Sequence, residues 1–335
     1  MRGMEPPRLM CVTVAWNHRD RLAMVLRSLD EQTRRPDGVI LVDAASRDGT
    51  TSWVSQNYPY VSVLRLFQHH GIGHAWRQGI RFALQRIPLE DRANTWVLCV
   101  APEVLLAQDL CEQLLASLES LPDVGSVGPV VLQAWRTQVD DESAPEVEST
   151  QQLVAIGTGL KRSFQWVYRH EGQGFTPELL PSATETLSVP GLCVLIREDD
   201  LELLADEQGA FAFAYEELES VFLDVGMRLR AMGKLNYVLP GAFAWRVDYR
   251  GGAVGRERWS ILLRKERDRQ RLADAGATGW LRLRSWPWRM GMRILRAPLA
   301  VWMRLTGGRA AAQVSLRHPK IRSWNLRESL WRWMK

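Results

Sequence analysis

Short apolar runs alternate with amphipathic segments over the first 120 residues. Continuous runs predict buried strands, at 12–16, 38–43, 61–67 and 96–104. Apolar residues at helical spacing predict helices between these strands, from about Asn17 to before Pro36 and at 50–57, 75–84 and 106–121. Because strand and helix alternate along the chain, the pattern indicates an α/β fold with a mostly parallel sheet wrapped by helices.

The middle of the chain is less regular. Its polar, acidic segment 138–151 predicts a surface loop. Further strands are predicted at 191–199 and, as a pair, at 235–245. A helix is predicted at 215–233, where an apolar stripe that includes Phe222 leaves Asp224 on the opposite, exposed side.

Composition is that of a globular protein. With 46% hydrophobic and 24% charged residues in 335, the chain can bury a large core. The four cysteines are widely spread, which favours a reduced, cytoplasmic setting. The start, MRGMEPPRLM, does not resemble a signal peptide, and no run of about 18 apolar residues predicts a membrane-spanning helix.

Charge divides the chain near residue 250. The last 85 residues hold 20 Lys/Arg and 5 Asp/Glu, a net charge of +15, against 23 and 33 in the rest, a net charge of −10. Eight of the 15 tryptophans lie in the same basic part. We therefore expect a catalytic body over 1–250 and a basic, Trp-rich, amphipathic helical tail over 251–335.

Arginines interleaved with tryptophans are typical of helices that lie on a membrane surface. The tail therefore predicts membrane association. The alternative is a helical subdomain that packs its tryptophans on the acidic body. Nucleic acid is not an expected partner, because the chain contains no recognisable nucleic-acid-binding module.

Polar side chains follow two predicted strands directly. Asn17 comes after the first strand, and Asp43 and Asp48 come after the second. Ligands of open α/β sheets bind outside the carboxyl ends of strands, so these three residues are predicted to contact a nucleotide-sugar. The alternative for the two acids is a turn in which they cap the next helix.

Five ordered segments resemble one large family of enzymes. They are AWNH (15–18), VDAASRDGT (42–50), HHGIGHAWRQGI (69–80), GLCVLIR (191–197) and RLRAMG (228–233). Over residues 9–250 the chain resembles the inverting glycosyltransferases of family 2, with a GT-A (Rossmann-like) fold, similar to bacterial rhamnosyl and cell-wall sugar transferases. The second segment is the most specific match.

The resemblance implies transfer of a sugar from a nucleotide diphosphate to an acceptor hydroxyl, with inversion. A carboxylate takes the hydroxyl proton, and a divalent metal (Mg²⁺ or Mn²⁺) or a cationic group holds the departing diphosphate. A hard cation bound by carboxylates stabilises that negative charge. A positioned base makes the poorly nucleophilic alcohol reactive.

The metal motif departs from the family pattern. Where the family has D-x-D, this chain reads Ala101, Pro102 and Glu103. Glu103 alone is left as a metal ligand of a weakened site or as a ribose contact, or it is a plain surface acid. The family's later histidine falls on Arg246, which we expect to neutralise the diphosphate, because a guanidinium pairs with phosphate oxygens.

The base motif departs as well. An ungapped match puts the family's acid pair on Val221 and Phe222, whereas a two-residue gap puts the base on Asp224. We predict Asp224 as the catalytic base; its alternative is an ion pair with Arg228 one helical turn away.

Two other polar groups carry weaker signals. Glu216, Glu217 and Glu219 are interpreted as charges that complement the helix dipole; the alternative is that they substitute for the missing acids of the family motifs. His69, His70 and His74 are interpreted as a loop beside the nucleotide rather than a metal site.

The sequence therefore predicts a glycosyltransferase of surface polysaccharide or glycolipid assembly with a lipid-linked or polysaccharide acceptor. It would be cytoplasmic and peripheral on the inner face of the cytoplasmic membrane. The alternative is a catalytically inactive relative that serves as a scaffold or nucleotide-binding partner. Nucleotidyl transfer is set aside, because AWNHRD contains no glycine-rich loop.

Overall fold

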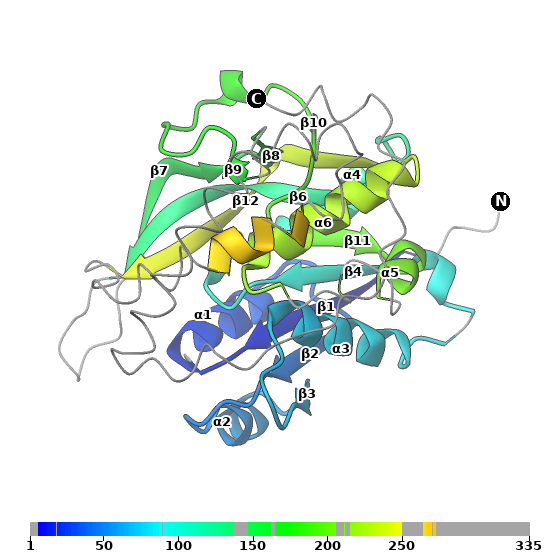
Figure 1. The fold of residues 1–335 in the computed structure, drawn as a ribbon, viewed down its shortest axis with the longest axis vertical. Coiled ribbons are helices and arrows are strands. Elements are labelled where there is room, and N and C mark those ends of the chain that lie inside the picture. The colour runs from blue at the N-terminus through cyan, green and yellow to red at the C-terminus, as the bar shows by residue number, and fades with distance from the viewer. Residues whose placement is uncertain are drawn as a thin grey trace, which may run out of the picture.

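The computed structural model describes residues 6–17, 19–88, 90–136, 147–161, 165–205, 211, 215–249, 264–269 and 271–272. These residues form one large mixed sheet with helices on both faces (Figure 1). The predicted α/β fold is confirmed.

The strands of the main sheet are β1 (Arg8–Ala15), β2 (Gly38–Asp43), β3 (Val61–Arg65), β4 (Thr95–Val100), β5 (Val104–Leu106), β6 (Val124–Arg136), β7 (Val147–Ala155), β10 (Thr184–Thr186), β11 (Cys193–Arg197) and β12 (Leu235–Tyr249). A separate two-stranded sheet contains β8 (Thr158–Leu160) and β9 (Trp166–Tyr168). The helices are α1 (Arg19–Asp30), α2 (Thr50–Asn57), α3 (Ile72–Leu84), α4 (Leu110–Ser117), α5 (Glu198–Leu204) and α6 (Leu218–Ala231), with short 3₁₀ turns at Arg92–Asn94 and Pro177–Leu179.

The strand order is β10-β12-β6-β11-β4-β1-β2-β3. β1 pairs in parallel with β2 and β4, and β2 pairs in parallel with β3. β11 runs antiparallel to both β4 and β6, and on its far side β6 pairs in parallel with β12. The amino-terminal half, β1 to β4, is therefore the part of the sheet in which every neighbouring pair is parallel. In that half the carboxyl ends of four strands meet at one edge, where a ligand is expected to bind.

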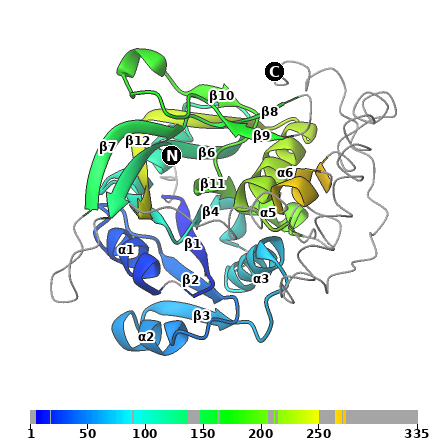
Figure 2. The ribbon, with the colours of Figure 1, turned by 60° about the vertical axis from the view of Figure 1, so that its left-hand side comes forward.

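The sheet separates two apolar clusters of buried side chains. Figure 2 shows α1 and α3 on opposite sides of the parallel strands. Along β1, Val12 and Val14 face α3 and α6, whereas Leu9 and Cys11 pack toward α1 and α4. Strands covered on both faces read as continuous apolar runs, and this is why their positions are readable in the sequence.

Three expectations about local structure were wrong. The helix predicted at 106–121 is limited to α4, because residues 104–106 pair with β12 as β5. Residues 147–151, expected in a surface loop, belong to β7, which pairs with β6. The strand pair predicted at 235–245 is the single strand β12, whose register with β6 shifts between Leu239 and Phe243.

The predicted tail, 251–335, lies mostly outside the described residues. Within it, residues 264–269 and 271–272 are helical and pack against the amino end of α6. We call these eight residues the clamp segment; they are orange in Figure 1. Among the described residues, no helix is long and apolar enough to cross a membrane.

Candidate functional site

The turn after β2 is built around Asp43. Its Oδ1 accepts the backbone N–H of Ser46 at 2.8 Å, and its Oδ2 accepts the hydroxyl of Thr51 in the first turn of α2. Asp43 is only 1% exposed. In this conformation its carboxylate organises the turn, as in the capping alternative, and its direct contact with a nucleotide stays a prediction.

Replacing Asp43 by alanine is expected to destabilise the fold by about 1–3 kcal/mol, because a buried N–H and a hydroxyl would lose their acceptor. Urea unfolding measures this loss. Glu31→Ala is the control, since it removes an exposed carboxylate whose one ion pair, to Arg27 at 2.8 Å, contributes about 0–1 kcal/mol. Equal unfolding midpoints for the two variants would contradict the role of Asp43.

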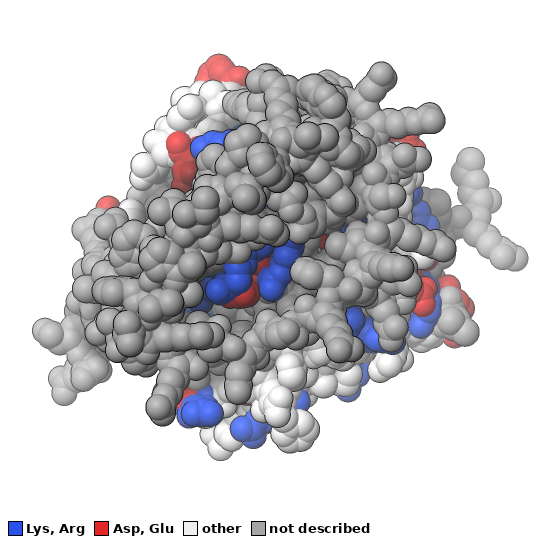
Figure 3. Space-filling model, in the orientation of Figure 1, with Lys and Arg blue, Asp and Glu red and all other residues white. Residues whose placement is uncertain are grey.

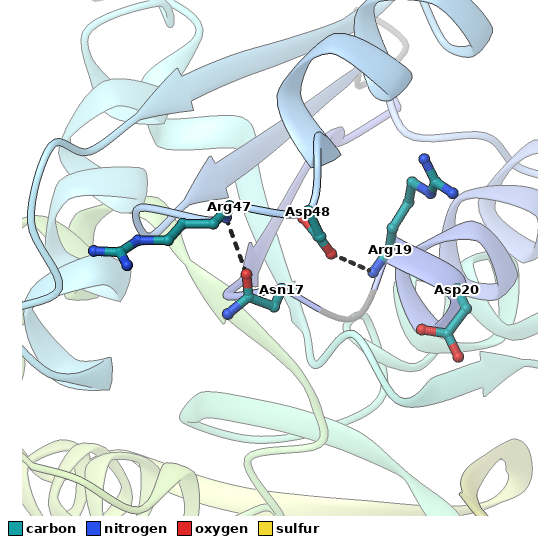
Figure 4. Close-up of a pocket in the computed structure, with 5 residues that line it drawn as sticks. All are labelled: Asn17, Arg19, Asp20, Arg47 and Asp48. Carbon is teal, nitrogen blue, oxygen red and sulfur yellow. Dashed lines mark hydrogen bonds between the residues drawn. The ribbon is translucent and has the colours of Figure 1, made fainter.

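Asn17 and Asp48 join the loops that follow β1 and β2 (Figure 4). The Asn17 carbonyl accepts the backbone N–H of Arg47 at 3.0 Å, and the Asp48 carboxylate accepts that of Arg19 at 3.1 Å. With Asp20 these four residues line a pocket of about 530 Å³. Asn17 and Asp48 therefore line the same pocket at the carboxyl edge of the sheet, and their contact with a nucleotide stays a prediction.

A second pocket of about 670 Å³ shares Asn17 and Arg47 and includes exposed aromatic rings. Trp16 is 50% exposed and stacks on His69, with ring centroids 4.4 Å apart and planes 6° from parallel. Burial lowers the pKa of His69, and His70 acts in the same direction. The stack is a flat, uncharged platform, and the guanidinium of Arg65 lies in the lining of the same pocket.

Arg246 lies on β12, opposite Val104 of β5 and Gln133 of β6. Its Nε donates to Asp248 at 2.9 Å and its Nη2 donates to the Gln133 side chain at 3.1 Å, so the guanidinium is fixed in place. The backbone carbonyl of Glu103 accepts the N–H of Val247 at 2.8 Å, which brings Glu103 next to Arg246. Partial burial raises the pKa of Glu103, while Arg21 and Arg246 act in the opposite direction.

Glu219, in the first turn of α6, is a candidate site residue that the sequence analysis set aside. It is 4% exposed, and Thr158 donates a hydrogen bond to its Oε2 at 3.4 Å. Burial raises the pKa of Glu219 to about 7, although Gly191, Tyr168, Thr158 and Arg246 all favour its charged form. Its Oε1 is buried and makes no hydrogen bond among the described residues.

The acid run ahead of α6 was a signal for this residue, but it was interpreted as a solvated charge that complements the helix dipole. The side chain instead turns inward toward Tyr168 on β9. Only the packing of β8 and β9 on α6 makes this visible, and that packing joins segments about 60 residues apart in the chain.

Asp224 is not on an exposed helix face, so that expectation was wrong. It is 0% exposed, because α6 is covered on nearly all sides, and its Oδ2 accepts from Arg228 Nε at 3.0 Å. Burial raises the pKa of Asp224 to about 6, and Arg228 opposes the rise. The ion pair with Arg228, named as the alternative, is thus present; a catalytic role for Asp224 stays a prediction.

Charge interactions connect the two parts of the site. Arg21, in the first turn of α1, acts on Glu103, and Glu216, just before α6, acts on His69 of the aromatic stack. The charges near the two pockets and those near Glu103 and the amino end of α6 therefore influence each other.

The residues around Glu103 do not fit a divalent metal. Ala101 and Pro102 supply no ligand atom in their side chains, and the charged groups that act on Glu103 include the cations Arg21 and Arg246. A second cation at this position would be repelled by the guanidinium groups. Within the described part of the chain, no three His, Cys, Asp or Glu side chains are grouped as metal ligands, and this includes His69, His70 and His74.

The known proteins that this chain resembles are glycosyltransferases. Residues 10–171 match the model of glycosyl transferase family 2. The N-acetylglucosaminyl-diphospho-decaprenol L-rhamnosyltransferase of Mycobacterium tuberculosis (strain CDC 1551 / Oshkosh) is 25% identical over 297 residues, which cover 88% of this chain and 91% of that protein. The protein of the same name from a second strain matches to the same extent.

A solved structure extends the likeness to the fold. The crystal structure of GalNAc-T7 with UDP, GalNAc and Mn²⁺ superposes with a TM-score of 0.59 at 11% identity, covering 83% of this chain. The chain spans about half the length of that protein, 49%. Taken together, these likenesses relate the chain to the glycosyltransferases of family 2 and identify its fold as GT-A.

Proposed function

We propose that this protein transfers a sugar from a nucleotide diphosphate to a hydroxyl group of a lipid-linked saccharide, with inversion at the sugar carbon. The observation that carries the proposal is the buried carboxylate of Glu219, whose Oε1 has no hydrogen-bond partner among the described residues and whose charged form the Arg246 guanidinium, held by Asp248 and Gln133, favours. The name of the mycobacterial relative supports a lipid-linked acceptor.

In this mechanism Glu219 is the general base. Its unpartnered Oε1 accepts the proton of the acceptor hydroxyl while the acceptor oxygen bonds to the anomeric carbon. The bond from that carbon to the diphosphate oxygen breaks in the same step, and the electron pair leaves with the diphosphate. A single displacement of this kind inverts the anomeric carbon.

Arg246 supplies the positive charge that the departing diphosphate requires. A guanidinium makes paired, charge-assisted hydrogen bonds to phosphate oxygens, and its two protein contacts keep it oriented before the reaction. Glu103 then orients the ribose or Arg246 instead of binding a metal. The proposed enzyme therefore works without a divalent cation. In this it differs from GalNAc-T7, whose crystal structure contains Mn²⁺.

The nucleotide is proposed to lie along the two pockets at the carboxyl edge of the sheet. Asn17 and Asp48 would then lie near the ribose, and the nucleobase would stack on Trp16. Replacing Trp16 by alanine is expected to weaken nucleotide binding by about 1–3 kcal/mol, or about 5- to 150-fold, because base stacking is lost. Calorimetric titration with UDP and dTDP measures this.

Tyr60→Ala is the matched control for Trp16→Ala. Tyr60 is 49% exposed, close to the 50% of Trp16, and its hydroxyl hydrogen-bonds to Asp30, remote from both pockets. Affinities that fall equally in the two variants would contradict a base platform at Trp16.

The pH profile reports the base directly. Glu219 must be deprotonated to accept a proton, and its pKa is raised to about 7. We therefore expect kcat/KM to fall about tenfold per pH unit below pH 7 and to level off above it. A profile that is flat between pH 5 and 8 would contradict this role.

Turnover itself is tested by offering the purified protein a panel of UDP- and dTDP-sugars with liposomes that carry lipid-linked saccharide acceptors. The proposal predicts release of nucleotide diphosphate that depends on acceptor, in EDTA as well as in Mn²⁺.

A cytoplasmic, peripheral location on the inner membrane face and a membrane contact through the tail remain proposals. Liposome sedimentation tests the membrane contact.

The rival function is a nucleotide-binding relative without catalysis. The replacement of the D-x-D acids by Ala101 and Pro102 favours it. Nucleotide binding with no turnover for any donor and acceptor would support this rival and overturn the enzyme.

A further inference from the structure

The amino end of α6 is capped by a residue from the clamp segment rather than by its own chain neighbours. Glu217, at the cap position, makes no side-chain capping hydrogen bond. Asp268 Oδ2 instead accepts the backbone N–H groups of Glu216 and Glu217 at 2.9 and 2.7 Å. Asp268 is 0% exposed, so this cap is an interior feature of the fold.

Ion pairs fix the same contact. Nε and Nη2 of Arg267 donate to the two oxygens of the Glu216 carboxylate, with Nε at 2.7 Å from Oε1. Arg271 Nη1 lies 2.9 Å from Asp268 Oδ1, and Arg264 Nε lies 3.5 Å from Glu217 Oε1. Figure 3 shows basic and acidic side chains gathered in the middle of this face, where Figure 1 shows the clamp segment over α6.

The clamp segment also contacts the strand opposite α6. The ammonium group of Lys265 lies 4.7 Å from the centroid of the Trp166 ring on β9. The same strand carries Tyr168, which acts on Glu219. The segment therefore contacts both elements that surround Glu219.

We propose that the clamp segment positions the catalytic carboxylate, with Asp268 as the positioning residue. Glu219 lies two residues beyond the capped N–H of Glu217, in the first helical turn, where the direction of a side chain depends on how that turn is closed. Without the cap the turn frays and Glu219 leaves its place between Thr158 and Tyr168. This inference rests on the proposed function only for the role of Glu219.

Asp268→Ala and Asp268→Asn in the full-length protein test it. Alanine removes the acceptor, whereas asparagine keeps one carbonyl oxygen that can accept the same N–H groups. In hydrogen–deuterium exchange, we expect about tenfold faster exchange of amides 216–220 for alanine, the size typical of a lost helix cap, and recovery of most protection for asparagine. We also expect kcat to fall about tenfold or more for alanine, with UDP or dTDP affinity and donor KM unchanged within about threefold.

Arg267→Gln serves as a second variant if Asp268→Ala does not fold, and should shift both readouts in the same direction. Glu31→Ala on α1 should shift neither. Unchanged exchange at 216–220, or equal losses for alanine and asparagine, would overturn the cap. Faster exchange with unchanged kcat would overturn its link to Glu219. If the wild-type protein has no turnover, the proposed function fails, and exchange at 216–220 still decides whether the cap exists.

Discussion

Glu219→Gln is expected to lower kcat by about 10²–10⁴-fold and to leave nucleotide affinity nearly unchanged, because glutamine keeps the shape but cannot accept the proton. The measurement is steady-state turnover beside a calorimetric titration with UDP or dTDP. Loss of the limb below pH 7 in the residual activity would show that this carboxyl is the group that titrates.

Asp224→Asn is the control on the same helix. Asp224 is also buried with a raised pKa, but its described charge interactions are with Arg228 and Tyr215 rather than with Arg246. We expect lower stability and a much smaller change in kcat. If Asp224→Asn abolishes turnover while Glu219→Gln does not, the base is Asp224, as the sequence pattern predicts, and the mechanism given above is wrong.

Arg246→Met is expected to lower kcat by about 10²–10³-fold, the effect typical of removing one preorganised group that stabilises charge in the transition state. Arg246→Lys should recover only part of this, because an ammonium group retains the charge but not the two-point geometry. Turnover is measured in EDTA and again in Mn²⁺.

Arg27→Met is the matched control, because Arg27 is exposed on α1 and pairs only with Glu31 among its described contacts. Its kcat should equal that of the wild type. A wild-type enzyme that is inactive in EDTA and restored by Mn²⁺, together with an active Arg246→Met variant, would show that a metal rather than Arg246 neutralises the diphosphate.

The sequence predicts the amino-terminal half of the fold well for a physical reason. β1, β2 and β4 are buried on both faces, so each is a continuous apolar run. The rule that ligands bind at the carboxyl ends of strands then points to the edge where Asn17 and Asp48 line one pocket. The turn chemistry that buries Asp43 depends on Thr51 and Ser46, which lie within eight residues of it.

The carboxyl-terminal half of the site depends on contacts that no local pattern encodes. An apolar stripe on a helix predicts one buried face and one exposed face, and Asp224 was predicted as the base because it lies opposite the stripe. α6 is buried on nearly all sides, so this distinction between the two faces does not hold. Glu219 faces β8 and β9, and Asp268 caps α6 from 50 residues away. The short strand β5 likewise exists only because β12 offers it an edge.

The most direct measurement is a crystal structure of the protein soaked with UDP or dTDP in EDTA. The account predicts the nucleobase stacked on the face of Trp16 and diphosphate oxygens at about 2.7–2.9 Å from the guanidinium of Arg246. Glu219 should face the space where the acceptor would enter. A nucleotide bound away from Arg246, or a diphosphate ordered only when Mn²⁺ is added and held through Glu103, would contradict it.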